Sequence, residues 1–395
     1  MVYYKRRILE QIKKRINDKE IIVLTGMRRV GKTTLYRMIF DSIKSQNKVF
    51  LDMENPIEQK VFEEKDYNNI LANLKEYGIN PEKKAYIFLD EIQAMPGAIK
   101  AIKYLYDHYE IKFFLTGSSS FYLKNFFPES LAGRKFVFEL FPLDFDEFLV
   151  FKNIEKPFYD KKLKKLASAK NIIAYEKYKK HYDEYMKYGG FPEVVLGKDI
   201  DSKKMRLNDI FKSYFEKDVR TLADFKELRA FRDLILLLMQ RVGSKLEVTK
   251  LASEIGVSRE TVYSFLSFLE NTYFVSFISP FTRNVDREIS GSRKVYLCDN
   301  GLLNQFAKVS EGALFENSVF LNLRKYGKIN YYQKRSGAEI DFILNKSIAL
   351  EVKLRGIDLD LKKLEKIAKA LKLPEWYIVS KNFVEGNHFI PAQDI

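Results

Sequence analysis

The segment Gly26-Met-Arg-Arg-Val-Gly31-Lys32-Thr33 constrains the fold more than any other part of the chain, because it fits the pattern G-x-x-x-x-G-K-[ST]. It follows an apolar run, Glu20–Thr25, and precedes a helical pattern, Thr34–Phe40. Glycines let such a loop turn its backbone N–H groups toward a phosphate, and the following helix adds its positive end. The segment therefore predicts a strand–loop–helix site for ATP, with Lys32 on the β- and γ-phosphates and Thr33 on Mg²⁺.

A second motif, Tyr86-Ile-Phe-Leu-Asp90-Glu91, is an apolar run that ends in two acids. Next to a phosphate-binding loop, Asp90 would hold the water shell of Mg²⁺, and Glu91 would polarise the attacking water as general base. Thr116 could sense the γ-phosphate, although a simple turn after a strand would give the same pattern. Arg28 and Arg29 could contact phosphate or a partner, or form surface salt bridges. The predicted ATP/ADP contacts are Gly26, Arg28, Arg29, Val30, Gly31, Lys32, Thr33, Thr34 and Thr116, with Thr33 and Asp90 on Mg²⁺.

Apolar periodicity divides the chain into four predicted parts. Residues 1–145 alternate short apolar runs with helical patterns, as a parallel α/β sheet does, and residues 146–226 are helical. Residues 227–300 give three helices and a strand pair, the layout of a winged helix-turn-helix, and residues 301–395 mix strands and helices again. The predicted strands are Glu20–Thr25, Val49–Asp52, Ala85–Asp90, Lys112–Thr116 and Lys135–Leu140, then Tyr273–Pro280 and Arg293–Leu297, and finally Ile329–Gln333, Glu339–Asn345, Ile348–Leu354 and Trp376–Ser380.

The winged-helix segment offers candidate DNA contacts. In its third helix, Ser258–Asn271, apolar residues recur at helical spacing and leave polar side chains for a groove. That helix carries only one arginine, and a single arginine gives few hydrogen bonds to base edges. The predicted contacts are therefore mainly with phosphates. The alternative is a lid or a subunit contact. The candidate DNA-binding residues are Arg259, Thr261, Arg283, Arg287, Arg293 and Lys294.

A set of charged residues in the last hundred positions predicts a second metal site. Side chains two apart on a strand share a face, so Glu351 and Lys353 project together. A hairpin around Asn345-Lys346 would bring Asp341 across from Glu351. Two facing carboxylates can bind Mg²⁺, and a lysine beside them can position a water for attack on a phosphodiester. Alternating charged and apolar residues are also what any half-exposed hairpin shows.

Composition limits the partners. A formal net charge of +15 attracts polyanions, of which nucleic acid is the commonest, although lysine-rich solvated surfaces give the same balance. No apolar run approaches the length of a membrane helix, and no signal region follows the first charges, so we expect a cytoplasmic protein. A single cysteine, Cys298, and three scattered histidines leave metal binding to oxygen ligands.

The motifs together resemble the AAA+ ATPases, and more narrowly an archaeal and bacterial branch that joins the ATPase to a winged helix and a nuclease-like domain of poorly known function. The resemblance covers nearly the whole chain. It rests on Gly26–Thr33, Leu89–Gln93, Leu115–Ser120, Ser130–Arg134, Gly189–Glu193 and Tyr214–Arg220. It implies that Arg134 acts as a finger on the nucleotide of a neighbouring subunit, and hence a homo-oligomer.

The final part resembles the PD-(D/E)xK nucleases. Asp341, Glu351 and Lys353 match the motif and Glu316 matches its helix acid, whereas Ile340 stands in place of the proline of the motif's name. The resemblance implies a restriction-endonuclease-like α/β domain over residues 301–395, beside an AAA+ P-loop domain over residues 1–145.

Two hypotheses follow for the function. In the first, an ATPase is coupled to DNA binding and DNA cleavage, as in a DNA-processing or defence machine. In the second, an ATP-dependent switch or transcriptional regulator uses its C-terminal fold only to bind DNA or protein. A small-molecule kinase fits less well, because Asp90 and Glu91 suit attack by water. The expected catalytic residues are Lys32, Glu91 and Arg134, and for cleavage Glu316, Asp341, Glu351 and Lys353.

Overall fold

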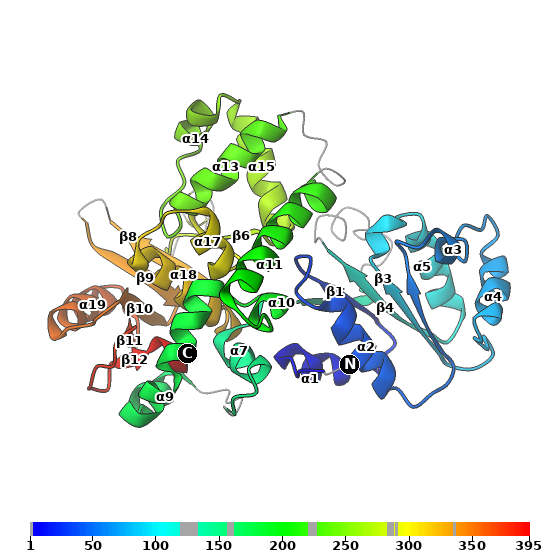
Figure 1. The fold of residues 1–395 in the computed structure, drawn as a ribbon, viewed down its shortest axis with the longest axis horizontal. Coiled ribbons are helices and arrows are strands. Elements are labelled where there is room, and N and C mark those ends of the chain that lie inside the picture. The colour runs from blue at the N-terminus through cyan, green and yellow to red at the C-terminus, as the bar shows by residue number, and fades with distance from the viewer. Residues whose placement is uncertain are drawn as a thin grey trace. The chain divides into compact units, whose positions relative to one another are not determined.

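A computed structural model describes residues 3–118, 133–155, 162–219, 227–282, 288, 291–334 and 337–395. The chain forms two compact units (Figure 1). The first unit holds Met1–Phe141 and Asn271–Tyr273, and the second holds Pro142–Glu270 and Phe274–Ile395. Two candidate DNA contacts, Arg283 and Arg287, lie outside the described residues.

The N-terminal unit is built on a five-stranded sheet of order β2-β3-β4-β1-β5, in which every neighbouring pair is parallel. Parallel strands need crossover connections, and helices supply most of them here. The elements are α1 (Arg7–Lys13), β1 (Ile21–Thr25), α2 (Lys32–Ser42), β2 (Lys48–Asp52), α3 (Pro56–Gln59), α4 (Tyr67–Glu76), β3 (Ala85–Asp90), the 3₁₀ turn η1 (Ile92–Ala94), α5 (Ala98–His108), β4 (Ile111–Gly117) and β5 (Lys135–Glu139).

Both faces of this sheet are covered, which is why its central strands are almost wholly apolar. All five residues of β1 are buried, and so are all seven of β4. On one face, α4 and α5 pack on the sheet, and their buried side chains form one hydrophobic cluster with those of the strands. On the other face, Tyr36 of α2 sets its ring edge-on against Phe88 and Phe114, which stack with ring centroids 4.1 Å apart. The loops after the strands therefore rest on a rigid base.

The C-terminal unit begins with helices and continues with three helices and a strand pair. The first helices are α7 (Phe145–Phe151), α8 (Leu163–Ala169), α9 (Ile172–Tyr188), α10 (Pro192–Val195), α11 (Ile200–Ser213) and the π-helical turn η2 (Tyr214–Val219). The next elements are α13 (Leu228–Gln240), α14 (Val248–Ile255) and α15 (Arg259–Asn271), with β6 (Val275–Ile278) and β7 (Lys294–Leu297) paired antiparallel. This is the helix and strand order predicted for residues 227–300.

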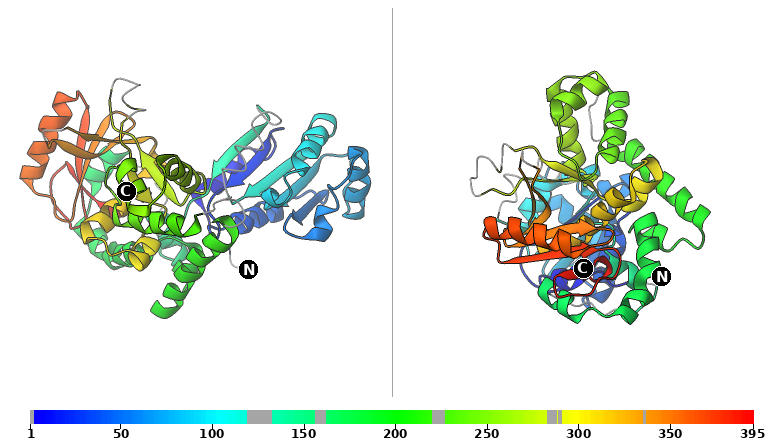
Figure 2. Two further views of the ribbon diagram at one scale, coloured as in Figure 1. Left: turned by 90° about the horizontal axis from the view of Figure 1, so that it is seen from above. Right: turned by 90° about the vertical axis from the view of Figure 1, so that its left-hand side faces the viewer.

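The last part of the unit holds a mixed sheet of order β12-β11-β10-β9-β8. Strands β8, β9 and β10 are antiparallel, whereas β10, β11 and β12 are parallel. In Figure 2, α19 in orange lies along this sheet, where it contacts β9, β10 and β11. The elements are α17 (Asn300–Phe306), α18 (Glu311–Leu323), the 3₁₀ turn η3 (Arg324–Tyr326), β8 (Ile329–Gln333), β9 (Glu339–Leu344), β10 (Ile348–Lys353), α19 (Asp358–Ala370), β11 (Glu375–Ser380), β12 (Phe389–Pro391) and the 3₁₀ turn η4 (Ala392–Asp394).

The predicted elements agree with the structure to within one or two residues in most places. Ala85–Asp90 and Ile329–Gln333 have the predicted bounds, whereas the strand expected at Tyr273–Pro280 is the shorter β6. Helix α1 and the edge strand β12 were not predicted from the sequence pattern. Among the described residues, no helix is both long enough and apolar enough to cross a membrane.

Candidate functional site

The loop between β1 and α2 has a backbone that only a few residue types tolerate. Gly26 has φ 152°, Arg29 has φ 65° and Gly31 has φ 97°. A Cβ on Gly26 would lie 2.1 Å from the carbonyl oxygen of Leu140, so the close approach of the loop to the end of β5 requires glycine. Because α2 begins at Lys32, the positive end of this helix faces the inside of the loop.

The side chain of Lys32 fills the centre of this loop. It is only 4% exposed, and its Nζ donates to the carbonyl oxygens of Gly26 (2.9 Å) and Met27 (3.1 Å). The amine is thus held where phosphate oxygens would meet the loop. This loop, its buried lysine and the helix start fit a nucleotide phosphate chain.

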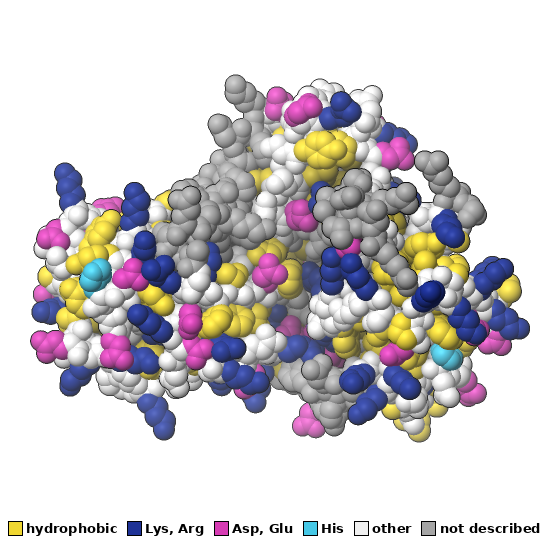
Figure 3. Space-filling view, turned by 180° about the vertical axis from the view of Figure 1, so that it is seen from behind, with side chains coloured by type: hydrophobic (Ala, Val, Ile, Leu, Met, Phe, Trp, Pro, Cys, Tyr) yellow, Lys and Arg dark blue, Asp and Glu magenta, His cyan; other side chains and the backbone are white. Residues whose placement is uncertain are grey.

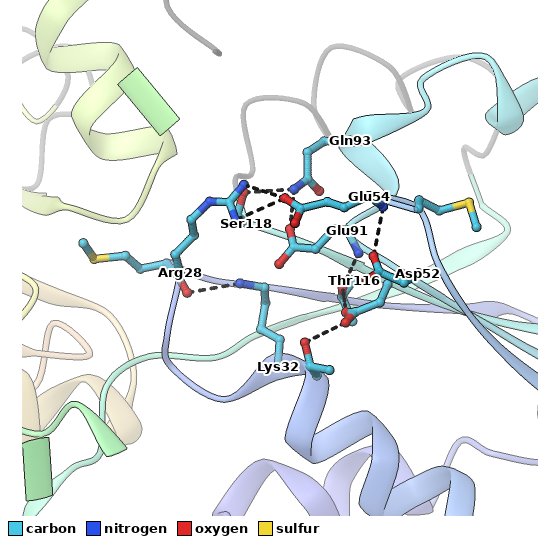
Figure 4. A network of polar contacts seen from close by, with 12 residues as sticks. Arg28, Lys32, Asp52, Glu54, Glu91, Gln93, Thr116 and Ser118 are labelled. Carbon is cyan, nitrogen blue, oxygen red and sulfur yellow. Dashed lines mark hydrogen bonds and ion pairs between the residues drawn. The ribbon is translucent and has the colours of Figure 1, made fainter. Parts of the chain in front are cut away.

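Thr33 and Asp90 come together as the two motifs predicted. The Thr33 hydroxyl donates to Asp90 Oδ2 at 2.7 Å, and the Thr116 hydroxyl donates to Asp90 Oδ1 (Figure 4). Burial raises the pKa of Asp90, against the opposing effect of the hydrogen bonds from Thr116 and Thr33. Thr116 also accepts a hydrogen bond from the backbone N–H of Glu91 at 2.9 Å. A hydroxyl and a carboxylate in contact are the hard oxygen ligands that Mg²⁺ prefers, so these residues fit the ion.

Glu91 lies just past the end of β3 in a left-handed backbone conformation, with φ 52° and ψ 48°. A non-glycine residue held this way costs on the order of 1 kcal/mol and is found most often at functional sites. Gln93 Nε2 donates to Glu91 Oε2 and, at 3.2 Å, to Ser118 Oγ. Sequence reasoning gave no role to Gln93 or Ser118, because their contact depends on how β3 and β4 lie side by side.

Two arginines near the loop contact distant parts of the chain. Arg28 forms an ion pair, which is one of the alternatives left open for it, whereas Arg6 had been given no role. Arg28 donates from both terminal nitrogens to Glu54 Oε1, at 3.3 and 3.4 Å. Arg6, just before α1, is buried and donates to the carbonyl oxygens of Val30 (3.0 Å) and Phe141 (2.8 Å). Arg6 therefore ties the phosphate-binding loop to the chain that leaves β5. Arg29 and Thr34, which are also predicted nucleotide contacts, are exposed.

Arg134 lies at the other end of the sheet from the loop. It directly precedes β5, its Nε donates to Asp107 Oδ1 at 3.1 Å, and its carbonyl accepts from the N–H of Ile21 at 2.8 Å. Strands β1 and β5 run parallel with Ile21 opposite Lys135, so Arg134 is level with the start of β1 whereas the loop follows its end. The fold does not bring Arg134 and the loop of the same chain together.

A second group of charged residues gathers at β9 and β10 of the C-terminal unit. Their antiparallel register pairs Leu350 with Phe342, which sets Asp341 across from Glu351 as predicted. Asp341 Oδ2 accepts from the N–H of Val352 at 2.8 Å. Lys353 Nζ donates to Glu351 Oε1 at 2.7 Å, while Glu351 Oε2 is buried without a hydrogen-bond partner.

Glu316 and Lys294 complete this carboxylate group. Glu316 on α18 accepts from the hydroxyl of Tyr296 at 2.7 Å. Lys294 had been expected among the DNA contacts, but it is 3% exposed and its Nζ lies 2.7 Å from Glu339 Oε1. Its amine thus belongs to the carboxylate group, because β7 turns it inward. Burial alone would lower the pKa of Lys294, but Glu316, Asp341 and Glu339 raise it by more.

The acids of this group carry raised pKa values. Burial, and then repulsion from Asp341, raises the pKa of Glu316 to about 7, and the same two causes raise the pKa of Glu351 to about 7. Burial also raises the pKa of Asp341. Buried acids this close to one another need a cation or a proton. Within the described part of the chain, no three His, Cys, Asp or Glu side chains are arranged to hold a metal ion, so a metal here would rest on two carboxylates and other ligands.

A groove of about 700 Å³ opens over these strands. Glu339, Glu351 and Lys353 lie along it, and the remaining lining includes lysines of the β8–β9 turn and of α19. Those lysines, Lys334, Lys363 and Lys366, are exposed.

The other predicted DNA contacts lie on α15 and at β7. Arg259 is exposed at the start of α15, and the hydroxyl of Thr261 is 3.1 Å from that of Ser258. Arg293 pairs with Glu270 at 3.3 Å. A groove of about 800 Å³ runs between α14, α15 and the chain before β7, and its lining includes Lys250, Tyr263 and Arg293. Tyr263 is 57% exposed.

Comparison with known proteins matches three family models and several uncharacterized proteins. A family model described as an AAA domain matches residues 18–149, and two models described as domains of unknown function match residues 179–313 and 311–388. The chain is 30% identical over 387 residues to the uncharacterized protein MJ1544 of Methanocaldococcus jannaschii, covering 93% of this chain and 82% of that protein. It is 29% identical over 341 residues to an uncharacterized protein of Haemophilus influenzae, covering 83% and 80%.

Among solved structures, the Aeropyrum pernix ORC1 protein in complex with DNA has a TM-score of 0.34 and 13% sequence identity. The match covers 80% of this chain and 93% of that chain. A likeness this weak carries no argument about this protein, whereas the family model identifies the N-terminal unit as an AAA-type P-loop domain.

Proposed function

Because the chain belongs to the same family as the uncharacterized protein MJ1544 of Methanocaldococcus jannaschii, and its N-terminal part is an AAA domain, we propose that it binds and hydrolyses ATP with magnesium. The observation that carries this proposal is the 2.7 Å contact between the Thr33 hydroxyl and Asp90, beside Lys32 in its loop. Glu91 follows Asp90 directly, so the base and the metal ligand stand at one strand end.

Each of these residues has a task in hydrolysis. The loop N–H groups and Lys32 hold the β- and γ-phosphates and neutralise charge there. Magnesium bound at Thr33 and Asp90 would offset charge between the two phosphates. Glu91 accepts a proton from a water whose oxygen attacks the γ-phosphorus, and the bond to the β–γ bridging oxygen breaks to give ADP and phosphate. Thr116 orients Asp90 and the backbone of Glu91.

Two variants test this assignment. Lys32→Ala is expected to lose nucleotide binding and turnover, whereas the exposed Lys44→Ala, with the same loss of charge, keeps both. Glu91→Gln is expected to keep ATP binding and to lose turnover by on the order of 10²- to 10⁴-fold, because only the base is removed. Steady-state phosphate release and nucleotide binding are measured for each protein. Normal turnover in Glu91→Gln would remove Glu91 from the role of base.

For the C-terminal unit we propose DNA as the partner. The net charge of +15 supports a polyanion, and Lys250 and Arg293 line the groove between α14 and α15. On the face seen in Figure 3, Lys and Arg side chains are spread among acidic ones rather than gathered in one patch, so the support for DNA comes from the overall charge and the groove. Binding that weakens steeply with salt and shows little sequence preference would support a DNA-processing machine. A tight, sequence-selective footprint would support a regulator, and no binding would make the helices a lid or subunit contact.

For the carboxylate group we propose metal-dependent cleavage of a phosphodiester. Asp341 and Glu351 supply two facing carboxylates, Lys353 can orient a water, and the buried, unpartnered Oε2 of Glu351 is an acceptor open to a cation. Duplex, single-stranded and branched DNA are incubated with Mg²⁺ or Mn²⁺, with and without ATP. Cutting that disappears in Asp341→Ala but persists in the exposed Asp209→Ala would establish a nuclease. Intact ATP hydrolysis without cutting would favour the alternative, an ATP-dependent switch whose carboxylates form a binding surface.

A further inference from the structure

The ion pair between Arg28 and Glu54 is looser than charged pairs usually are. Arg28 lies inside the phosphate-binding loop and its side chain is 16% exposed. Its two terminal nitrogens share one oxygen of Glu54 at 3.3 and 3.4 Å, whereas charge-assisted hydrogen bonds are usually about 2.8 Å long and often use both carboxylate oxygens. Glu54 is therefore a partner that a better acceptor can replace.

Glu54 is anchored next to the magnesium ligand. Strand β2 pairs with β3 so that Asp52 lies opposite Asp90, and the N–H of Met53 donates to the carbonyl oxygen of Asp90 at 2.9 Å. The N–H of Glu54 donates to Asp52 Oδ1 at 2.9 Å. The side chain of Arg28 therefore reaches from the loop to the end of β2. This end lies beside the end of β3, which carries Asp90 and Glu91.

Arg28 also lies among several acids. Figure 4 shows its guanidinium group beside Glu54, with Glu91 and Gln93 close by and Lys32 on the other side of the network. Asp52, Glu54, Asp90 and Glu91 stand at two neighbouring strand ends. Four acids would oppose the approach of a nucleotide, and the charge of Arg28 offsets that of Glu54. A γ-phosphate held between Lys32 and Glu91 would lie in the same network of side chains as this guanidinium group.

We propose that Arg28 exchanges Glu54 for the γ-phosphate of ATP, so that this loop distinguishes ATP from ADP within one chain. The inference rests on the proposed ATPase function. A γ-phosphate offers three oxygens and more charge than one carboxylate oxygen, so it displaces Glu54 from Arg28. When the γ-phosphate leaves as phosphate, Glu54 returns to Arg28, which favours release of the product.

The test compares two nucleotides in the full-length protein. Dissociation constants for ADP and for a non-hydrolysable ATP analogue are measured for wild type, Arg28→Gln, Glu54→Gln and the double variant. Arg28→Gln is expected to weaken analogue binding about tenfold or more while ADP binding changes less than about twofold, since Arg28 contacts only the γ-phosphate. Glu54→Gln is expected to tighten analogue binding several-fold. Arg229→Gln and Glu82→Gln, exposed residues that are not part of the loop or of α2, are the matched controls.

The double variant separates exchange from simple repulsion. If Glu54 acts by holding Arg28, its substitution has no effect once Arg28 is gone. If Glu54 only repels phosphate, Glu54→Gln tightens analogue binding equally in the Arg28→Gln background, and the proposal is overturned. Equal weakening of ADP and analogue by Arg28→Gln also overturns it. A wild-type protein that binds neither nucleotide overturns the ATPase proposal itself. If Arg28→Gln keeps normal turnover and an unchanged ratio of the dissociation constants for ADP and the analogue, only the exchange is overturned.

Discussion

At Gly26 the backbone leaves no room for a side chain. Its φ of 152° and the approach of the Leu140 carbonyl oxygen both exclude a Cβ. Gly26→Ala is therefore expected to lower the free energy of unfolding of the N-terminal unit by on the order of 3 kcal/mol and to abolish nucleotide binding. Urea unfolding and nucleotide titration check both effects. Gly97→Ala is the control, because a Cβ there meets nothing within 4 Å. Unimpaired nucleotide binding in Gly26→Ala would contradict the loop geometry.

The raised pKa values of the carboxylate group predict a pH dependence. A carboxyl with a pKa of about 7 in the folded state and 4.5 in the unfolded state, as for Glu316 and Glu351, binds more protons when folded between these values. The contribution of these two groups to stability is therefore fully present below pH 4.5 and is lost as the pH rises through 7. A shift of this size in one group corresponds to about 3 kcal/mol.

The measurement is the free energy of unfolding of the metal-free protein, from urea titrations between pH 5.5 and 7.5. Glu316→Gln is expected to flatten the slope of unfolding free energy against pH, because it removes one of the groups whose pKa is raised on folding. The exposed Glu385→Gln leaves the slope unchanged. Glu288 has a pKa lowered to about 2, so it changes its protonation below this pH range and does not affect the measured slope. An unchanged slope in Glu316→Gln would mean that Glu316 does not gain a proton on folding.

The roles of some residues follow from a local sequence pattern, whereas the contacts of others exist only because the fold brings distant parts of the chain together. Lys32 and Thr33 lie within one contiguous motif, and Asp90 ends an apolar strand, so their chemistry follows from sequence. Arg6 reaches Phe141 across 135 positions, and the carboxylate partner of Arg28 lies on another strand end. No spacing rule links such residues, because the order of strands in the sheet decides which loops become neighbours.

Among the elements, the β9–β10 hairpin was the most predictable. Its alternation of charged and apolar residues sets the register, and the turn lies at Asn345 and Lys346, both with positive φ. Asn345 also fastens the turn, because its Oδ1 accepts from the N–H of Lys328 at 2.9 Å and its Nδ2 donates to the carbonyl oxygen of Tyr326 at 2.8 Å. This turn holds Asp341 across from Glu351.

Two substitutions at Asn345 separate backbone strain from these hydrogen bonds. Asn345→Gly tolerates the φ of 50° but loses both bonds, so it is expected to cost about 1 kcal/mol of unfolding free energy. Asn345→Ala adds strain and is expected to cost about 1–2 kcal/mol more. Urea unfolding measures both. Equal losses in the two variants would show that the left-handed conformation is not strained.

Other elements carried too little local signal. Strand β12 has three residues, too few for a periodic pattern, and it is a strand only because β11 offers it an edge. Lys294 looked like an exposed wing residue, since its position in β7 does not reveal that Glu339 and Glu316 lie beneath it. Burial of a charged residue depends on partners supplied by distant strands.

At the scale of the whole molecule, the position of Arg134 leads to a prediction about assembly. Arg134 lies at the start of β5, level with Ile21, and the loop lies beyond the far end of β1, so its side chain cannot act on the nucleotide of its own chain. If it completes the site of a second copy, Arg134→Ala keeps nucleotide affinity and loses turnover. Turnover per subunit of the wild type then rises with protein concentration.

Mixing two inactive variants gives the sharpest test of action between subunits. Arg134→Ala subunits keep Lys32 and Glu91, and Glu91→Gln subunits keep Arg134, so a mixed oligomer contains at least one complete site. Phosphate release from the mixture is therefore expected to exceed the sum of the two separate samples. Mixing Glu91→Gln with Lys32→Ala is the negative control. If each subunit lends only its arginine, this mixture shows no recovery, because neither chain holds both an intact loop lysine and the base. Wild-type turnover that is independent of concentration, with no recovery in the first mixture, would confine Arg134 to its ion pair with Asp107.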